Sequence, residues 1–319
     1  MSSFSHYRLY GLCLRSQLPL TAPLAAESAP PDFTVHLGAD LLAQAAPPAG
    51  ELWARADFGN GFGVQLTKTE TGWSLFYPQT GEFRLSRDLR FGTAHALPGK
   101  ADILSLLLHG SVLAWWLNLR GEPVLHASAV AIGDEALAFM GASGMGKSTL
   151  ATLLCSAGAG LVTDDVLRLQ PVGADFRCHW GTGEVRLRPN AASLATSFPS
   201  TSASQSADGR TTLLLAENAT ALPRLRAIVI PQPSRLHTTL VVERLSAVPA
   251  SFHLNGYARV YGWQVDAPRR RQFELFSALA GQVPLYRAHI PWGPPFAVGL
   301  PQQLAAACSL SWHCPQPPA

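Results

Sequence analysis

A glycine-rich segment that matches the pattern G-x-x-x-x-G-K-[ST] in full is the clearest chemical signal in the chain. It runs Gly141-Ala142-Ser143-Gly144-Met145-Gly146-Lys147-Ser148, and Thr149 follows. Glycines lack a Cβ, so successive backbone N–H groups can surround a phosphate, and the N-terminus of a following helix attracts the same anion. Lys147 would bring a positive charge to the outer phosphates and Ser148 a hydroxyl to Mg²⁺. The segment predicts binding of ATP, as a purine nucleoside triphosphate, together with magnesium.

The alternative is a flexible turn that contains a lysine by accident. Lysine is rare here, because only Lys68, Lys100 and Lys147 are lysines among the 24 basic residues. An apolar segment over 136–140 predicts a strand before the loop, and a helix is predicted from 147 to about 157. A strand, a glycine-rich loop and a helix in this order form the phosphate-binding unit of P-loop proteins. The order therefore favours a phosphate site.

Two adjacent carboxylates, Asp164 and Asp165, follow a short apolar segment that predicts a strand over 160–163. At the end of such a strand, a carboxylate can hold the metal or take the proton from an attacking hydroxyl. The pair suggests that these two tasks are divided, without showing which residue does which. An exposed turn is the alternative interpretation. The chain carries no Walker B segment of the ATPase kind, which argues against motor and transporter ATPases.

A histidine, His126, lies at the start of a predicted hairpin whose strands run over 124–132 and 136–140 and turn at Gly133-Asp134. In that hairpin the numbers of paired residues sum to 267, so His126 falls opposite Gly141 at the mouth of the glycine-rich loop. An imidazole there could contact the γ-phosphate or orient an aspartate. A buried structural histidine is the alternative.

Three charged residues, Glu184, Arg186 and Arg188, alternate with aliphatic residues and therefore share one face of a predicted strand. Arginines in such a row suit phosphate or carboxylate binding, so Arg186 and Arg188 are candidate nucleotide contacts. Glu184 is a candidate metal ligand together with Ser148 and Asp165. A solvated face at the sheet edge is the alternative.

The elements that must position these residues fall into two parts. Residues 1–99 alternate short apolar segments, one of them over 7–14, with turn signals, and predict a β-rich accessory domain. Residues 100–319 predict a P-loop domain in which strands alternate with helices. Within it, the Ser/Thr/Ala-rich segment of about 190–209 has few large side chains and predicts a mobile loop. The fold class is therefore α/β with a mixed sheet.

An apolar segment over 103–119 has two interpretations. It is shorter than the ~20 residues of a membrane span and contains His109, Gly110, Ser111 and Asn118. A helix buried against a sheet explains such a segment better than a membrane anchor does.

The composition of the chain limits the classes of partner and the cellular location that are expected. The 319 residues carry a net charge of only +3, which gives no reason to expect a nucleic acid or a membrane as partner. The five cysteines show no zinc-binding spacing and indicate free thiols in a reducing compartment. The first residues lack the pattern of a secretory signal, so a cytoplasmic location is expected. The oligomeric state stays open, a homo-oligomer included.

Together, His126, the loop 141–148 and the segment ending in Asp164-Asp165 resemble the core of bacterial HPr kinase/phosphorylase, which is related to ATP-dependent phosphoenolpyruvate carboxykinase. The resemblance covers about residues 122–190. It implies that Mg-ATP phosphorylates a serine hydroxyl, with one aspartate as the base and the other assisting the metal. Leu187 stands where that family has a glycine after Glu-x-Arg, and Thr149 where it has a glutamate, which weakens both correspondences.

The opening residues 7–12, Leu18-Pro19-Leu20 and the segment 284–287 resemble a subgroup related to HPr kinase. Its members accompany peptide-modification clusters and include kinases of the C-terminal serine of lasso-peptide precursors. This resemblance spans most of the chain through loose motifs. It implies an ATP-dependent serine kinase whose acceptor is a peptide or small protein. The alternatives are a small-molecule kinase and a non-catalytic nucleotide-binding module, neither of which would phosphorylate a peptide.

Overall fold

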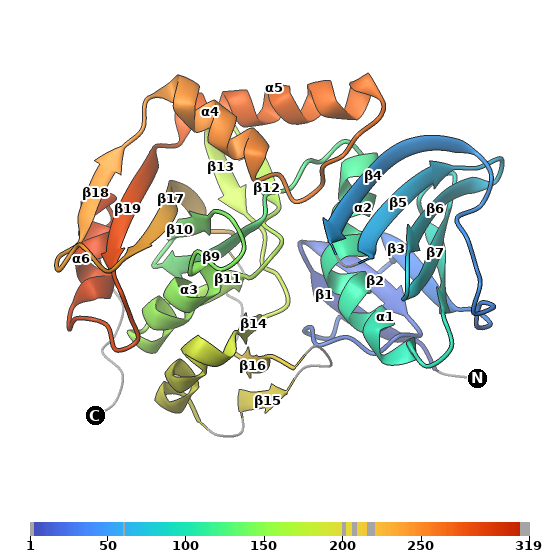
Figure 1. Ribbon diagram of the computed structural model, residues 1–319, viewed down its shortest axis with the longest axis horizontal. Coiled ribbons are helices and arrows are strands. Elements are labelled where there is room, and N and C mark those ends of the chain that lie inside the picture. The colour runs from blue at the N-terminus through green and yellow to red at the C-terminus, as the bar shows by residue number, and fades with distance from the viewer. Residues whose placement is uncertain (1–2, 60, 200–201, 206–208, 216–220, 313–319) are drawn as a thin grey trace. The chain divides into compact units, whose positions relative to one another are not determined.

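The computed structural model describes residues 3–59, 61–199, 202–205, 209–215 and 221–312 (Figure 1). The fold is mixed α/β, and the chain forms two compact units. The first unit contains residues 1–123 and 260–272, and the second contains residues 124–259 and 273–319. The chain therefore passes between the units three times, after Pro123, Arg259 and Gln272.

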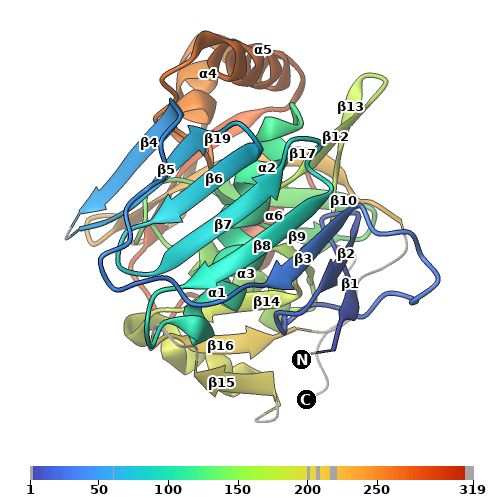
Figure 2. The same ribbon diagram turned by 90° about the vertical axis from the view of Figure 1, so that its right-hand side faces the viewer.

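The first unit is built on an eight-stranded sheet, which Figure 2 shows face-on with the strands in the order β1-β2-β3-β8-β7-β6-β5-β4. Its strands are β1 (Ser5–Leu9), β2 (Leu12–Ser16), β3 (Phe33–Leu37), β4 (Glu51–Gly59), β5 (Phe62–Lys68), β6 (Gly72–Tyr77), β7 (Gly81–Ser86) and β8 (Phe91–Ala96). The single strand predicted over 7–14 is wrong. Tyr10 and Gly11 both have positive φ, which makes the two-residue turn of a hairpin between β1 and β2.

The apolar segment predicted as a helix packs against this sheet. It forms α1 (Ala101–Leu107), a π-helical turn η1 (Leu108–Val112) and α2 (Leu113–Leu119). The ring of the fully buried Trp116 lies 5.3 Å from that of Phe33, and its Nε1 donates to Leu89 O at 2.7 Å. Tyr77 Oη donates to Ser111 Oγ at 2.9 Å. These contacts place the helix in the first unit, because a helix this apolar needs the sheet to cover it. The predicted boundary between residues 99 and 100 comes before this helix, whereas the first unit continues to residue 123.

By length and composition, Ala101–Leu119 is the one helix among the described residues that could cross a membrane. Half of the most apolar 18-residue stretch of this helix is buried in the structure. The core helix of a globular unit has the same composition, and the contacts with the sheet favour that interpretation.

Replacing Trp116 with alanine is expected to destabilise the first unit by about 3–5 kcal/mol, because the change leaves a cavity and removes a buried hydrogen bond. Urea unfolding followed by far-UV circular dichroism measures this loss. Phe91→Ala is the matched control on the same sheet, since that ring is 52% exposed and its loss should cost less than about 1 kcal/mol. An unchanged unfolding midpoint for Trp116→Ala would contradict the packing of this helix.

Residues 260–272 complete the first unit although they come late in the chain. Arg55 N donates to Gly262 O at 2.9 Å, and Trp263 forms a bridge with Ala54 and an edge-to-face ring contact with Trp115 at 5.1 Å. Gly262 has φ +81°, and a Cβ there would lie 2.1 Å from Arg55 O. Only glycine suits this position, so the segment fits closely against β4.

The second unit contains the remaining strands and most of the helices. Its elements are β9 (Ala127–Ile132), β10 (Glu135–Met140), α3 (Lys147–Ser156), β11 (Gly160–Thr163), β12 (Leu169–Val172), β13 (Asp175–Cys178), β14 (Glu184–Leu187), η2 (Pro189–Ser197), β15 (Ala203–Gln205), β16 (Thr211–Leu214), β17 (Arg224–Ser234), β18 (Val241–Arg244), α4 (Ala247–Gly256), β19 (Leu285–Pro291) and α6 (Leu300–Ala307). Helix α5 (Asp266–Gln282) begins in the first unit and ends in the second.

The main sheet of the second unit has the order β11-β9-β10-β17-β13-β12, with β19 beside β17 and β18 beside β19. It is mixed, because β10, β17 and β19 are parallel while β9 and β11 are antiparallel to their neighbours. Side chains of β10 alternate between two buried clusters: Leu137 and Phe139 pack with α3 and α6, and Ala138 and Met140 pack with α4 and α5. Because both faces are covered, the strand is apolar throughout.

A small sheet in the order β14-β16-β15 accompanies the main one. The segment 190–209, predicted as a mobile loop, contains η2 and β15 where the structure describes it. Ala191 and Leu194 are buried with Leu187 and Leu213, so the segment has enough apolar contacts to form regular structure. Residues 200–201 and 206–208 of this prediction lie outside the described residues.

Candidate active site

The glycine-rich loop connects β10 to α3, as the sequence predicts (Figure 1). Gly144 and Gly146 have φ of +89° and +87°, which a side chain would strain, and Gly146 directly precedes the first helical residue, Lys147. The Lys147 ammonium donates to Gly141 O at 2.8 Å and Ala142 O at 3.2 Å. Burial lowers the pKa of Lys147, and the nearby carboxylates of Asp165 and Asp164 only partly offset that effect. The loop thus holds a buried cation at a helix N-terminus, where an anion is favoured.

The predicted hairpin register is confirmed. Glu135 pairs with Ile132 and Met140 with Ala127, so paired numbers sum to 267 throughout β9 and β10. His126, one residue before β9, therefore lies at the mouth of the loop that begins at Gly141.

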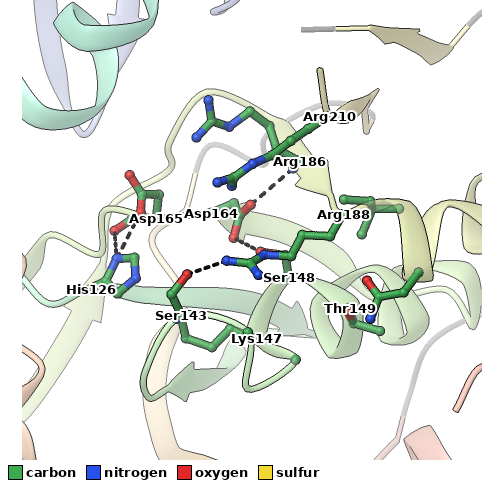
Figure 3. Close-up of a pocket in the computed structure, with 14 residues that line it drawn as sticks. His126, Ser143, Lys147, Ser148, Thr149, Asp164, Asp165, Arg186, Arg188 and Arg210 are labelled. Carbon is green, nitrogen blue, oxygen red and sulfur yellow. Dashed lines mark hydrogen bonds and ion pairs between the residues drawn. The ribbon is translucent and has the colours of Figure 1, made fainter. Parts of the chain in front are cut away.

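A pocket opens in front of this loop and brings most of the predicted residues together (Figure 3). It contains about 670 Å³ of space, which includes open solvent. Its lining consists of His126, Ser143, Gly144, Gly146, Lys147, Ser148, Thr149, Asp164, Asp165, Arg186, Leu187, Arg188, Asn190 and Arg210. Gly141, Ala142 and Met145 belong to the loop without lining this pocket.

The two aspartates have different partners. Asp164 accepts hydrogen bonds at Oδ1 from Ser148 Oγ at 2.9 Å and from Ser128 Oγ, and at Oδ2 from the backbone N–H of Arg186 at 3.2 Å. A carboxylate and a hydroxyl therefore meet at the first turn of α3, beside the phosphate loop. Oxygen ligands of this kind suit Mg²⁺, which binds proteins through one or two such groups and takes the rest from phosphate and water. The residues thus fit magnesium at Ser148 and Asp164.

Asp165 also lines the pocket and lies between a histidine and an arginine. Its Oδ1 is 2.9 Å from His126 Nδ1, and its Oδ2 accepts from Arg259 Nη2 at 2.8 Å. Its backbone is left-handed, with φ +77°, a conformation that Asp tolerates better than most residues. Burial alone would raise the pKa of Asp165, but Arg259 and His126 hold it well below the ordinary value of 3.8. Asp165 is therefore an ionised carboxylate with a fixed orientation.

Replacing Arg259 with glutamine is expected to move acid unfolding of the second unit toward higher pH. Because the pKa of Asp165 is lowered in the folded state, its contribution to stability is present above pH 3.8 and is lost as pH falls through the lowered pKa. Without the positive charge of Arg259, the effect of burial is less offset, and the pKa of Asp165 rises. Near-UV circular dichroism across an acid titration measures the shift. Arg226→Gln, which removes an arginine 3.8 Å from Glu135, is the matched control and should leave the titration unchanged.

Arginines line the pocket from β14 and the segments beside it. Arg188 Nη2 donates to Ser143 Oγ at 2.8 Å, which brings its charge to the phosphate loop, and Arg186 and Arg210 approach from the same side (Figure 3). Glu184 is placed differently from the predicted metal site. It is 7% exposed on β14 and does not line the pocket, whereas Arg186, two residues later on the same strand, does.

Three contributors were missed by sequence reasoning: Ser128, Arg210 and Arg259. Ser128 is a polar residue in a buried strand, 0% exposed, which is a weak signal for a functional contact. Arg259 follows α4 and lies 94 residues after Asp165 in the chain. No sequence pattern near either residue indicates that Arg259 pairs with Asp165. The described residues contain no group of three or more His, Cys, Asp or Glu side chains placed to hold a metal by themselves.

Comparison with known proteins gives little beyond this geometry. No family model matches the chain, and no curated protein matches it. Among solved structures, the Hpr(Ser) kinase/phosphatase from Coxiella burnetii is similar over 58% of this chain and 93% of its own length, with 11% sequence identity and a TM-score of 0.30. That score is too low for the likeness to support a conclusion about what this chain does.

Proposed function

We propose that this chain is an ATP-dependent kinase that transfers the γ-phosphoryl group to a serine hydroxyl of a peptide or small protein. One observation carries the proposal: Ser148 Oγ, at the start of the helix after the phosphate loop, donates to Asp164 at 2.9 Å, while Asp165 faces the same pocket. A phosphate site whose pocket is lined by two carboxylates with different partners suits phosphoryl transfer better than nucleotide binding alone.

The phosphate end of ATP would be bound by backbone N–H groups of the loop and by Lys147. For this, the ammonium exchanges the carbonyls of Gly141 and Ala142 for phosphate oxygens. Arg188, already beside Ser143, adds a second positive charge. Ser148 and Asp164 would hold Mg²⁺, which when bound neutralises charge on the phosphates.

The acceptor would be positioned by Asp165. Each carboxylate oxygen has two lone pairs, so Asp165 can accept from a substrate hydroxyl while it keeps its contacts with His126 and Arg259. The hydroxyl oxygen forms a bond to the γ-phosphorus as the bond to the ADP oxygen breaks, and the hydroxyl proton passes to Asp165. The transition state of such transfers is loose, so orientation counts for more than the strength of the base. A carboxylate with a lowered pKa is adequate for this task.

The acceptor class rests on the resemblance to the lasso-precursor kinase subgroup. A cytoplasmic location is proposed because the spacing of the cysteines indicates free thiols in a reducing compartment. The direct experiment incubates the purified protein with Mg-ATP and peptides that end in serine, followed by mass spectrometry for a phosphoryl increment. Peptides that end in alanine are the matched control. Phosphorylation of metabolites but not of peptides would indicate a small-molecule kinase. ATP binding without any transfer would indicate a nucleotide-binding module.

A further inference from the structure

A second cavity lies next to the phosphate loop and has a different chemical character. It contains about 510 Å³ of space, which includes open solvent, and it shares Gly144, Gly146, Thr149 and Asn190 with the pocket described above. Its other walls are mostly apolar and include prolines of β17 and the two aromatic residues Trp292 and Phe296. The two cavities therefore meet at the loop, one lined by charged groups and the other by prolines and aromatic rings.

We propose that this second cavity binds the purine base of the nucleotide, an inference that rests on the proposed function. A nucleotide whose phosphates lie in the loop must extend from it in one direction with its terminal phosphate and in the other with its nucleoside. The pocket with Asp164 and Asp165 receives the terminal phosphate and the acceptor. The apolar cavity also touches the loop, and a planar aromatic base suits its walls.

The strand ends beside the loop hold this cavity in place. A Cβ on Gly146 would lie 3.9 Å from Pro233, and one on Gly141 would lie 3.9 Å from Pro231, so both prolines of β17 adjoin the loop. Trp292 follows β19 directly, and its backbone N–H donates to Ser234 O at the end of β17 at 2.9 Å. Two parallel strands thus fix the position of the tryptophan relative to the loop.

Trp292 offers aromatic surface on a rigid backbone. Its side chain is 51% exposed, and the guanidinium of Arg235 lies 4.2 Å from the centre of its ring. Phe296 packs at close range against Gly293, where a Cβ would lie 2.4 Å from the phenyl ring. Stacking on aromatic side chains binds nucleobases and tolerates different bases, since every base has a π-face.

Few side chains in this cavity could read the edge of a base. Thr149 and Asn190 are the lining residues with a side-chain hydroxyl or amide, and Trp292 adds one N–H donor. Strong selection between bases needs buried groups that hydrogen-bond to one base and lose that partner with another. We therefore expect ATP and GTP to bind with affinities that differ by less than about tenfold.

Replacing Trp292 with alanine tests the site by calorimetry of the full chain with two probes, ATP and inorganic tripolyphosphate, both with Mg²⁺. Loss of stacking is expected to raise the Kd for ATP by about 10–100-fold. The Kd for tripolyphosphate, which has no base, is expected to change less than twofold. Trp292→Phe should restore most of the ATP affinity, because a phenyl ring also stacks. Phe252→Ala is the matched control, since that ring is 73% exposed on α4 and lines neither cavity.

A second variant keeps the tryptophan and obstructs the cavity. Gly293→Ala would force the Phe296 ring to move, so weaker ATP binding with unchanged tripolyphosphate binding is expected. Unchanged ATP affinity in both Trp292→Ala and Gly293→Ala would overturn the base site while leaving the phosphate site intact. If wild-type protein bound neither probe, the proposed function itself would fail. Equal weakening of both probes would show that Trp292 supports the loop and not the base.

Discussion

Replacement of Lys147 with alanine is expected to lower phosphoryl transfer by about 1000-fold, because the change removes a positive charge aimed at the developing charge on the phosphates. In the structure, Lys147 is 7% exposed, and the hydrogen bonds described for its ammonium go to loop carbonyls. Burial disfavours the charged form of Lys147, so replacing this residue should change the free energy of unfolding little. The same variant is therefore expected to unfold at a similar or slightly higher urea concentration. Transfer is measured with labelled ATP and a serine peptide.

Lys100→Ala is the matched control, since Lys100 is an exposed lysine that precedes α1 in the first unit. Its transfer rate should equal that of the unmodified protein. Transfer within tenfold of normal in Lys147→Ala would contradict the assignment of the loop as the phosphate site. A large loss of stability would instead mean that Lys147 has a structural task.

Replacing either Asp164 or Asp165 with asparagine is expected to lower phosphoryl transfer by about 100–1000-fold. The two variants are expected to differ in the Mg²⁺ concentration that they require. Asp164 accepts from Ser148, so Asp164→Asn should raise the Mg²⁺ concentration needed for half-maximal transfer. Asp165 contacts His126 and Arg259, so Asp165→Asn should lower the rate at saturating Mg²⁺ and leave the Mg²⁺ requirement unchanged. Rates measured across a magnesium titration separate the two results.

Asp175→Asn serves as the control for this pair. Its side chain is 45% exposed and lies 3.6 Å from Arg224, away from the pocket. Its rate and magnesium requirement should both be normal. If Asp165→Asn raised the magnesium requirement and Asp164→Asn did not, Asp165 and not Asp164 would hold the metal. This would agree with the prediction from sequence that paired Asp165 with Ser148.

The parts of the site that could be predicted are those determined by neighbours in the chain. The loop needs glycines at fixed spacing, and the hairpin register follows from the turn at Gly133-Asp134, so His126 could be placed opposite Gly141. Asp164 and Asp165 lie at the end of β11 as expected, because an apolar segment after a helix in a P-loop unit forms a strand.

The parts that could not be predicted depend on contacts between distant segments. Arg259 pairs with Asp165 through the packing of α4, and nothing near Arg259 in sequence points to a carboxylate. Trp292 approaches the loop because β19 pairs with β17, a strand pairing that composition does not specify. The regular structure in the described part of 190–209 could not be predicted, because Ala191 and Leu194 are a weak signal in a Ser/Thr/Ala-rich segment, yet both are buried against residues of the small sheet.

The three crossings of the chain between its units have a consequence for synthesis on the ribosome. A domain made first usually folds first, while later residues are still being translated at ~5–20 per second. Here Gly262 and Trp263 fit against β4 and the apolar helix, so the unit that begins the chain stays incomplete until the ribosome has passed residue 272. Translation from residue 124 to 272 takes roughly 7–30 s at those rates. During that interval the part of β4 that later contacts Gly262 lacks its backbone hydrogen-bond partner.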